Sequence, residues 1–214
     1  MAEIKLSKRL QKIFELVPEC RTFADVGTDH ALLPIKTVLS GKAERAILTD
    51  INEGPLKAAD KNIGLYGADR TKFDLRLGDG LCPILPEEAE ITAICGMGGL
   101  LIASILERGK MTAKTAKKLI LSPNTCWEEL RRYLSENGYR IINEETLAED
   151  GHPYLIIEAV YDGIKREISD CYLGDFLFKM DPGYAALLRK RSENVLLHVE
   201  SEFHRNVIKK LENI

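Results

Sequence analysis

Apolar residues along this chain form short continuous runs that alternate with stretches of helical periodicity. The first such stretch has an apolar face and a basic face, and it predicts a leading helix within residues 1–21. Ser7 is placed to begin this helix and Pro18 to end it. The apolar residues at helical spacing are Leu6, Leu10, Ile13, Phe14 and Val17.

Beyond residue 21 the two kinds of stretch alternate regularly. We expect strands at residues 22–26, 44–49, 73–77, 91–95 and 119–121. We expect helices at residues 31–39, 53–66, 100–108 and 127–137. Repeated strand–helix units predict an α/β fold, a parallel and doubly wound sheet with helices on both faces.

The repeat ends in two strands with no helix between them. We expect these strands at residues 139–147 and 154–161, joined through Gly151-His152-Pro153. Because so short a connection permits only an antiparallel pair, the last strand should run against the others. A sheet of seven strands with the last one antiparallel resembles the Rossmann-like fold of class I methyltransferases.

From about residue 165 the chain becomes more polar. Asp181-Pro182-Gly183 is a break, and residues 184–211 predict one charged helix with a thin apolar stripe. A stripe this narrow indicates an appended helical arm, such as one side of a coiled coil. We therefore divide the chain into a domain at residues 1–164 and a C-terminal arm at residues 165–214.

Composition narrows the class of protein. The chain has 214 residues, of which 45% are hydrophobic and 29% charged, as is typical of a globular domain with a sizeable core. Its five cysteines are scattered without a Cys-x-x-Cys pair, which argues against a disulfide framework and a metal site. With no secretory signal and no apolar run of bilayer length, we expect a cytoplasmic protein without a membrane partner. The oligomeric state stays open, with a monomer favoured.

Charge is distributed unevenly along the chain. The net charge of −3 combines about +2 in residues 1–21, about +2 in residues 183–214 and about −7 between them. Basic ends around an acidic centre are compatible with RNA binding through the ends. Ordinary solvated helix faces explain charge sums of this size equally well.

Polar or glycine-rich loops follow five of the predicted strands. Ligands of open parallel sheets bind beyond the carboxyl ends of the strands, so these loops should line one cleft. The loops are Gly27-Thr28-Asp29-His30, Asp50-Ile51-Asn52, Gly78-Asp79-Gly80, Gly96-Met97-Gly98-Gly99 and Ser122-Pro123-Asn124.

The first loop has one glycine where a dinucleotide fingerprint needs three. Without a glycine-rich loop little is left to cradle a pyrophosphate, which favours S-adenosylmethionine over NAD as cofactor. Asp50 follows at about the 20-residue spacing of an acid that binds ribose, although it is also typical of a turn. Gly27 and Gly96 would let the backbone approach a ligand closely.

Together these motifs resemble those of the bacterial tRNA adenine-N1 methyltransferases of the TrmK type, which act on adenine 22 of tRNA. The resemblance runs in order from about residue 4 to residue 180. Asp-His-Ala-x-Leu-Pro combined with Gly-Met-Gly-Gly is far more specific than any glycine pattern. The matching segments are 6–10 (LSKRL), 24–34 (ADVGTDHALLP), 50–55 (DINEGP), 78–81 (GDGL), 96–99 (GMGG) and 122–124 (SPN).

The resemblance implies that S-adenosylmethionine is the methyl donor and that tRNA is the partner and acceptor. It places Gly27 and Asp29-His30 near the methionine part, Asp50 at the ribose and Asp79-Gly80 at the adenine. Residues 96–99 stand where many base methylases carry an Asn/Asp-Pro-Pro-aromatic motif. The expected cofactor-binding residues are Asp25, Gly27, Thr28, Asp29, Asp50, Ile51, Asp79, Gly80, Cys95, Gly96, Met97 and Gly98, and the expected catalytic residues are Asp29, His30 and Asn124.

The chain departs from the family pattern at two positions. Leu32 stands where the family commonly has Tyr, and Asp50 stands where it has Glu. The C-terminal arm is also expected to be shorter than the family's two-helix coiled coil.

Methyl transfer to adenine N1 needs alignment more than activation, since a sulfonium methyl is already electrophilic. Asp29 is predicted to accept the proton that the methylated base loses or to stabilise the cationic base, with His30 as second choice. Asn124 could hold the adenine edge through its amide. For His30 and Asn124, a purely structural role at a helix start or a turn is an equal alternative.

Other functions remain open from the residues alone. A protein with this fold could bind RNA without catalysis, although Asp29, Asp79 and the loop at residues 96–99 would then be idle. An NAD-dependent dehydrogenase is disfavoured by the missing glycines and the antiparallel ending. A methyltransferase that acts on another RNA base or on a small molecule is the nearest alternative.

Overall fold

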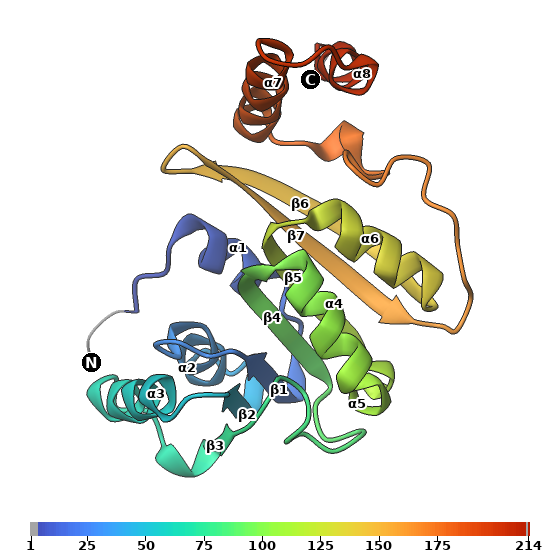
Figure 1. Ribbon diagram of the computed structural model, residues 1–214. Helices are drawn as coiled ribbons and strands as arrows, with labels where there is room; N and C mark the ends of the chain where they lie inside the picture. Colours follow the sequence, from blue (N-terminus) through green and yellow to red (C-terminus); the bar gives the residue numbers. More distant parts are fainter. Residues whose placement is uncertain (1–3, 213) are drawn as a thin grey trace.

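The computed structural model describes residues 4–212 and residue 214. A seven-stranded sheet lies at its centre in the order β3-β2-β1-β4-β5-β7-β6, and β7 runs antiparallel to both of its neighbours (Figure 1). The predicted fold class is therefore confirmed. Residues 1–3 of the expected leading segment and residue 213 of the expected arm lie outside the described residues. The strands are β1 (Cys20–Val26), β2 (Ala43–Asp50), β3 (Phe73–Leu77), β4 (Ile91–Gly98), β5 (Lys118–Thr125), β6 (Tyr139–Glu149) and β7 (His152–Tyr161).

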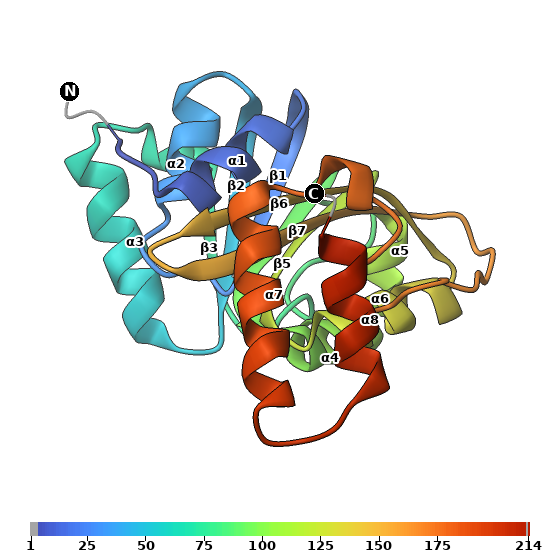
Figure 2. The same ribbon diagram turned by 90° about the horizontal axis from the view of Figure 1, so that it is seen from above.

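Helices cover both faces of this sheet (Figures 1 and 2). One face carries α1 (Lys8–Leu16), α2 (Leu32–Leu39) and α3 (Glu53–Leu65). The other face carries α4 (Gly99–Arg108), α5 (Lys110–Thr115) and α6 (Trp127–Glu136), followed by α7 (Pro182–Leu196) and α8 (Glu202–Leu211) at the C-terminal end. Two short 3-10 turns complete the order: η1 (Arg70–Lys72) between α3 and β3, and η2 (Leu177–Lys179) between β7 and α7. No helix among the described residues is both long and apolar enough to cross a membrane.

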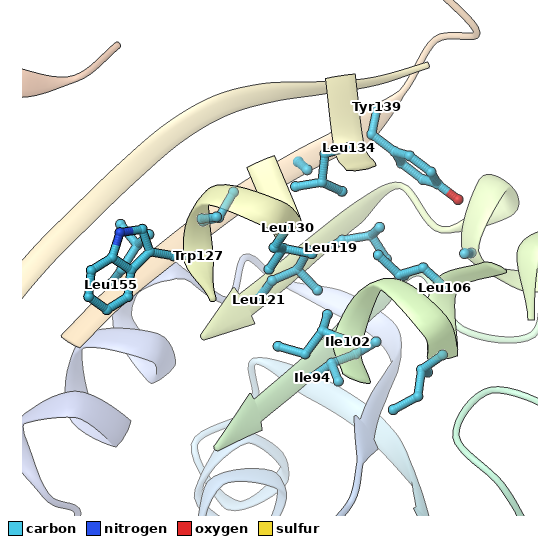
Figure 3. Packing of buried hydrophobic residues seen from close by; sticks show 14 of the residues in the cluster. Ile94, Ile102, Leu106, Leu119, Leu121, Trp127, Leu130, Leu134, Tyr139 and Leu155 are labelled. Atoms are coloured by element: carbon cyan, nitrogen blue, oxygen red, sulfur yellow. The ribbon is translucent and has the colours of Figure 1, made fainter. Parts of the chain in front are cut away.

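Alternation along the strands divides the core into two clusters. Successive side chains of a strand point to opposite faces, so each central strand contributes to both clusters. Figure 3 shows the packing of one of them, where α4 and α6 meet β4 and β5. This cluster includes Ala24, Ile47, Ile94, Leu121 and Ile157, whereas the other includes Phe23, Leu48, Ala93, Ile120 and Ile156.

Several predicted bounds need correction. The strands β4 and β5 continue beyond the predicted ranges, so Gly96-Met97-Gly98 and Ser122-Pro123-Asn124 lie inside strands. The short helix α5 was not predicted. The prediction of one helix over residues 184–211 is wrong, because the chain breaks at residues 197–201 and forms α7 and α8, which pack side by side (Figure 2). The hydroxyl of Ser201 accepts from the amide of His204 and starts the second helix.

The C-terminal helices do not extend away from the sheet. Tyr184 and Leu188 of α7 are fully buried in the same cluster as Leu155 of β7. At about 25 cal/mol per Å² of apolar surface, each such side chain stabilises this contact by roughly 2 kcal/mol. The helix α7 therefore packs against β6 and β7, and α8 packs against α7.

A buried ion pair fixes the segment that leads to α7. The guanidinium of Arg131 (α6) binds the carboxylate of Glu144 (β6) with two contacts of 2.7 and 3.2 Å, and both side chains are almost fully buried. The same guanidinium donates to the backbone carbonyls of Cys171 and Tyr172 at 2.9 and 2.7 Å. Breaking a buried pair leaves an uncompensated charge, which costs about 3–5 kcal/mol. Residues 171–174 are thus held between α6 and β6.

We expect Gly174→Ala to destabilise the protein more than Gly41→Ala. Both glycines have a positive φ, +77° and +78°, so both substitutions incur backbone strain of about 1–2 kcal/mol. A Cβ at Gly174 would also press on the carboxylate of Glu144 and the guanidinium of Arg131, whereas a Cβ at Gly41 meets no atom within 4 Å. Urea unfolding should show an additional loss of about 2 kcal/mol for Gly174→Ala. Equal losses in the two variants would contradict the constraint.

Candidate active site

A cleft of about 460 Å³ opens at the carboxyl ends of the central parallel strands. The strand β1 pairs in parallel with β2 on one side and with β4 on the other. The helices that follow β1 and β2 lie on one face of the sheet, and the helix that follows β4 lies on the other face. The crevice opens between β1 and β4, where the chain direction changes. The cleft is lined by Arg9, Leu10, Asp25, Gly27, Asp29, His30, Ala31, Leu32, Leu33, Asp50, Cys95, Gly96, Met97 and Asn124.

The turn after β1 is held tightly to β2. The backbone amides of Gly27 and Thr28 both donate to the carbonyl of Thr49, at 2.8 and 3.0 Å. Gly27 has φ +74°, and a Cβ at this position would overlap the Met97 side chain of β4. The positive φ therefore favours glycine at this position, whereas the Met97 methyl group that fills the space of a Cβ is the flexible end of a side chain.

Asp25 is a buried carboxylate at the floor of the cleft. Its Oδ2 accepts a hydrogen bond of 2.7 Å from the hydroxyl of Thr28. Burial raises the pKa of Asp25 to about 6, and the Thr28 hydrogen bond lowers the pKa only in part. The predicted cofactor residue Thr28 is itself buried and acts on the cleft through Asp25.

Asp29 and His30 lie at the exposed mouth of the cleft. Their side chains are 80% and 62% exposed, and Nε2 of His30 lies 3.6 Å from Oδ2 of Asp29. Because both side chains are largely exposed, neither is fixed by packing against the core. The carbonyl of His30 accepts a hydrogen bond of 2.9 Å from Asn62, which ties this loop to α3.

The acids after β2 and β3 are placed differently from each other. Asp50 lines the cleft, and its Oδ1 accepts from the amide of Asn52 at 2.7 Å. Asp79 lies outside the lining and forms an ion pair of 2.9 Å with Arg108 of α4. Ile51, next to Asp50, is 65% exposed, which is unusual for a large apolar side chain beside a polar cleft.

Two of the predicted glycines are used for packing between elements. Gly80 has φ +58°; its carbonyl accepts from the Thr49 hydroxyl at 2.9 Å, and a Cβ there would press on Ile105 of α4. Gly98 packs against the hydroxyl of Thr125. Both residues lie beside the cleft and outside its lining.

The glycines of the Gly-Met-Gly-Gly segment have distinct structural causes. Gly96 has φ +79° and is exposed in the cleft, where a Cβ would meet only the Arg9 guanidinium at 3.7 Å. Gly99 is buried at the start of α4, where a Cβ would overlap the backbone carbonyl of Cys126. The first glycine thus opens the cleft, and the last permits α4 to pack against the turn before α6.

Asn124 is held by an amide network that reaches α1. Its Nδ2 donates to the carbonyl of Gly96 at 2.8 Å, and its Oδ1 accepts from Nη1 of Arg9 at 3.3 Å. The Arg9 guanidinium also lies 5.1 Å from the centre of the Tyr154 ring. Oδ1 and Nδ2 each retain one further hydrogen-bonding position, so Asn124 could still bind a ligand.

The helix that carries Arg9 is fixed from the far end of the sheet. The carboxylate of Glu149, at the end of β6, accepts from the backbone amides of Lys8 and Arg9 at 2.6 and 3.2 Å. These are first-turn amides that have no partner within a helix, and a negative charge there also complements the helix dipole. The Ser7 hydroxyl accepts from the amide of Leu10 at 3.2 Å, as predicted for the start of this helix.

The structure brings together most of the predicted site residues. Five further residues line the cleft and were not predicted as site residues: Arg9, Leu10, Ala31, Leu32 and Leu33. Arg9 belongs to the LSKRL segment, the one signal that could have indicated it. The predicted residues that line the cleft are Asp25, Gly27, Asp29, His30, Asp50, Cys95, Gly96, Met97 and Asn124, and those that do not are Thr28, Ile51, Asp79, Gly80 and Gly98.

We expect the stability of an Asp25→Asn variant to depend on pH differently from that of the parent. Because the pKa of Asp25 is raised in the folded protein, stabilisation by the protonated form is complete below about pH 4 and is lost as pH rises through about 6. Asn carries no charge at any pH. The variant should match the parent at pH 4 and exceed its free energy of unfolding by up to about 3 kcal/mol at pH 8. Urea unfolding from pH 4 to 8 tests this, and a difference that does not change with pH would contradict it.

Comparison with known proteins agrees with this geometry. The family model of the methyltransferase domain matches residues 6–157. The tRNA (adenine(22)-N(1))-methyltransferase of Bacillus subtilis is 39% identical over 208 residues, which cover 94% of this chain and 85% of that protein. A tRNA methyltransferase-like protein of Mycoplasma pneumoniae is 31% identical over 71% of this chain and 70% of its own length.

Solved structures resemble the chain over nearly its whole length. A Streptococcus pneumoniae protein in complex with S-adenosyl-L-methionine has a TM-score of 0.87 at 32% identity, with 98% of this chain and 99% of that chain covered. The B. subtilis m1A22 tRNA methyltransferase TrmK has a TM-score of 0.76 at 34% identity, with 99% and 96% covered. The C-terminal helices are included in these matches. The chain therefore belongs to the family of tRNA (adenine(22)-N(1))-methyltransferases.

Proposed function

We propose that this protein transfers a methyl group from S-adenosylmethionine to N1 of adenine 22 in tRNA. The observation that carries the proposal is the exposed pair Asp29 and His30 at the mouth of a cleft formed by the carboxyl ends of the central strands. The 39% identity to the B. subtilis enzyme over 94% of the chain supports the choice of substrate. We expect the enzyme to act in the cytoplasm and as a monomer.

The residues of the cleft fit S-adenosylmethionine. Gly96 leaves open the space that a Cβ would take, Gly27 also lines the cleft, and Asp50 presents a carboxylate that can accept from a ribose diol. No glycine-rich cradle for a pyrophosphate is present among the described residues of the first turn, which agrees with a ligand that has no phosphate. When bound, S-adenosylmethionine supplies a methyl group activated by a sulfonium.

Asp79 is assigned to the adenine of the cofactor by its position after β3, although it lies outside the lining of the cleft. Its carboxylate is bound to Arg108, and both side chains are partly exposed, so the pair contributes little to stability. Asp79 could therefore turn from Arg108 toward an adenine amino group at small cost. Ile51, exposed at the end of β2, offers an apolar surface for the same ring.

Asp29 and Asn124 act on the acceptor base in this proposal. Methylation at N1 leaves a positive charge on the adenine, and the carboxylate of Asp29 stabilises this charge or accepts the proton from the exocyclic amine. Asn124 offers a donor and an acceptor to the base edge, and Arg9 holds that amide in place. Adenine 22 must be unstacked to reach the cleft.

Mass spectrometry of tRNA nucleosides is the direct test of the proposed activity. Purified protein is incubated with unmodified tRNA and S-adenosylmethionine, and 1-methyladenosine is expected to appear at position 22. Methylation at another base, or of small molecules only, would replace the proposed substrate. Failure to bind S-adenosylmethionine in calorimetry would overturn the proposal as a whole.

We expect Asp29→Ala to lower kcat for tRNA about 100-fold at saturating donor, because loss of a charge or a proton acceptor next to the reacting base removes transition-state stabilisation. Asp29→Asn keeps the shape and should show a similar loss if charge is what matters. Glu136→Ala is the control. Glu136 lies at the C-terminal end of α6, away from the end that follows Asn124, and this variant should turn over like the parent. Undiminished turnover of Asp29→Ala would remove this residue from the mechanism.

A further inference from the structure

A second cavity of about 340 Å³ adjoins the active-site cleft. The two share one lining residue, Asn124, whose side chain lies on the boundary between them. The second cavity is lined by Asn124, Trp127, His152, Pro153, Tyr154 and Arg191. It therefore connects the end of β5 and the start of α6 with the start of β7 and with α7.

Trp127 forms a wall of this cavity with an unsatisfied donor. The side chain is 3% exposed, and Figure 3 shows the indole packed beside Leu155 at the start of α6. Its Nε1 is buried and has no hydrogen-bond partner among the described residues. A buried donor without a partner is destabilising, so a ligand acceptor that reached this nitrogen would be favoured.

Arg191 brings a positive charge to the same wall. Its guanidinium lies 5.3 Å from the centre of the Trp127 ring, in a cation–π contact. Within the described part of the chain, no carboxylate forms an ion pair with Arg191, whereas its neighbour Arg189 is paired with Glu193. The guanidinium is exposed and keeps its donors available for a ligand.

The chemistry of the cavity suits a nucleotide. Nε1 of Trp127 and the guanidinium of Arg191 are donors only, which selects an anion rich in acceptor oxygens such as phosphate. The rings of Tyr154 and His152 offer flat surfaces on which a base can stack. Asn124 lies at the boundary of the two cavities, so its amide can form hydrogen bonds with the edge of a purine while it also lines the donor cleft.

We propose that this second cavity binds the extruded acceptor nucleotide of RNA, with its 5′-phosphate on Arg191 and Trp127 and its base against the rings of Tyr154 and His152, with Asn124 at its edge. The proposal rests on the proposed function and adds to it that α7 supplies one wall of the acceptor site. The C-terminal helices are then part of the site that recognises the nucleotide.

The single tryptophan of the chain makes the proposal measurable, because all tryptophan fluorescence comes from Trp127. Adenosine 5′-monophosphate and adenosine are each titrated into the full-length protein saturated with S-adenosylhomocysteine, which blocks the donor cleft. We expect the monophosphate to change the fluorescence and to bind about tenfold or more tighter than adenosine, since a charge-assisted phosphate contact is worth about 1.5–3 kcal/mol. Arg191→Ala should abolish this preference, and Arg189→Ala should preserve it.

The same variants are then tested with tRNA. Arg191→Ala should raise KM for tRNA about tenfold and leave kcat and the affinity for S-adenosylhomocysteine within about twofold of the parent. Trp127→Phe keeps an aromatic ring and should raise KM for lack of the Nε1 donor. If the parent binds adenosine and adenosine 5′-monophosphate equally, or if Arg191→Ala keeps the preference for the monophosphate, the acceptor subsite is overturned. Absence of tRNA methylation by the parent would overturn the proposed function instead, and the nucleotide titration would still judge the subsite.

Discussion

The parallel pairing of β1 with two neighbours is the constraint on which the site depends. Its register aligns Val26 with Thr49 of β2 and with Ile94 of β4, so β1 and β2 end at nearly the same level while β4 continues to Gly98. The chain leaves β1 and β2 toward one face and β4 toward the other, and no backbone closes the space between. Because the Gly27 and Thr28 amides bind the Thr49 carbonyl, the turn cannot fold over this space either. That arrangement positions the cleft residues that follow β1, β2 and β4, whereas Arg9 and Leu10 come from α1 and Asn124 from β5.

The two-faced sheet could be predicted from sequence because local pattern and tertiary structure agree there. Each central strand is apolar on both faces, and five helices (α1 to α4 and α6) each end within two residues of a Pro or Gly, as α1 does before Pro18. The break between α7 and α8 could not be predicted, since residues 197–201 contain neither Pro nor Gly and the apolar stripe continues across them. The return of α8 onto α7 is a tertiary effect, visible in sequence only through the cap at Ser201.

Sequence could predict the cleft residues that lie at the ends of strands. It could not predict those that come from elements distant in the sequence. Asp25, Asp29, Asp50 and Asn124 follow from the rule that ligands bind beyond the carboxyl ends of parallel strands. Arg9 reaches the cleft from a helix that precedes the sheet, and no local pattern distinguishes it from Lys8 or Lys12. The glycines show the same limit, because the sequence cannot separate one that opens a cleft from one, such as Gly99, that packs against a carbonyl.

The contact of Glu149 with the start of α1 has a consequence for biogenesis. The helix that presents Arg9 leaves the ribosome about 140 residues ahead of the carboxylate that fixes its amides. At about 5–20 residues per second, this delay is of the order of ten seconds. A nascent chain therefore carries an unanchored first helix until the hairpin of β6 and β7 has emerged. Such a chain cannot hold Asn124 through Arg9, so this side of the cleft is completed only after β6 and β7 have formed.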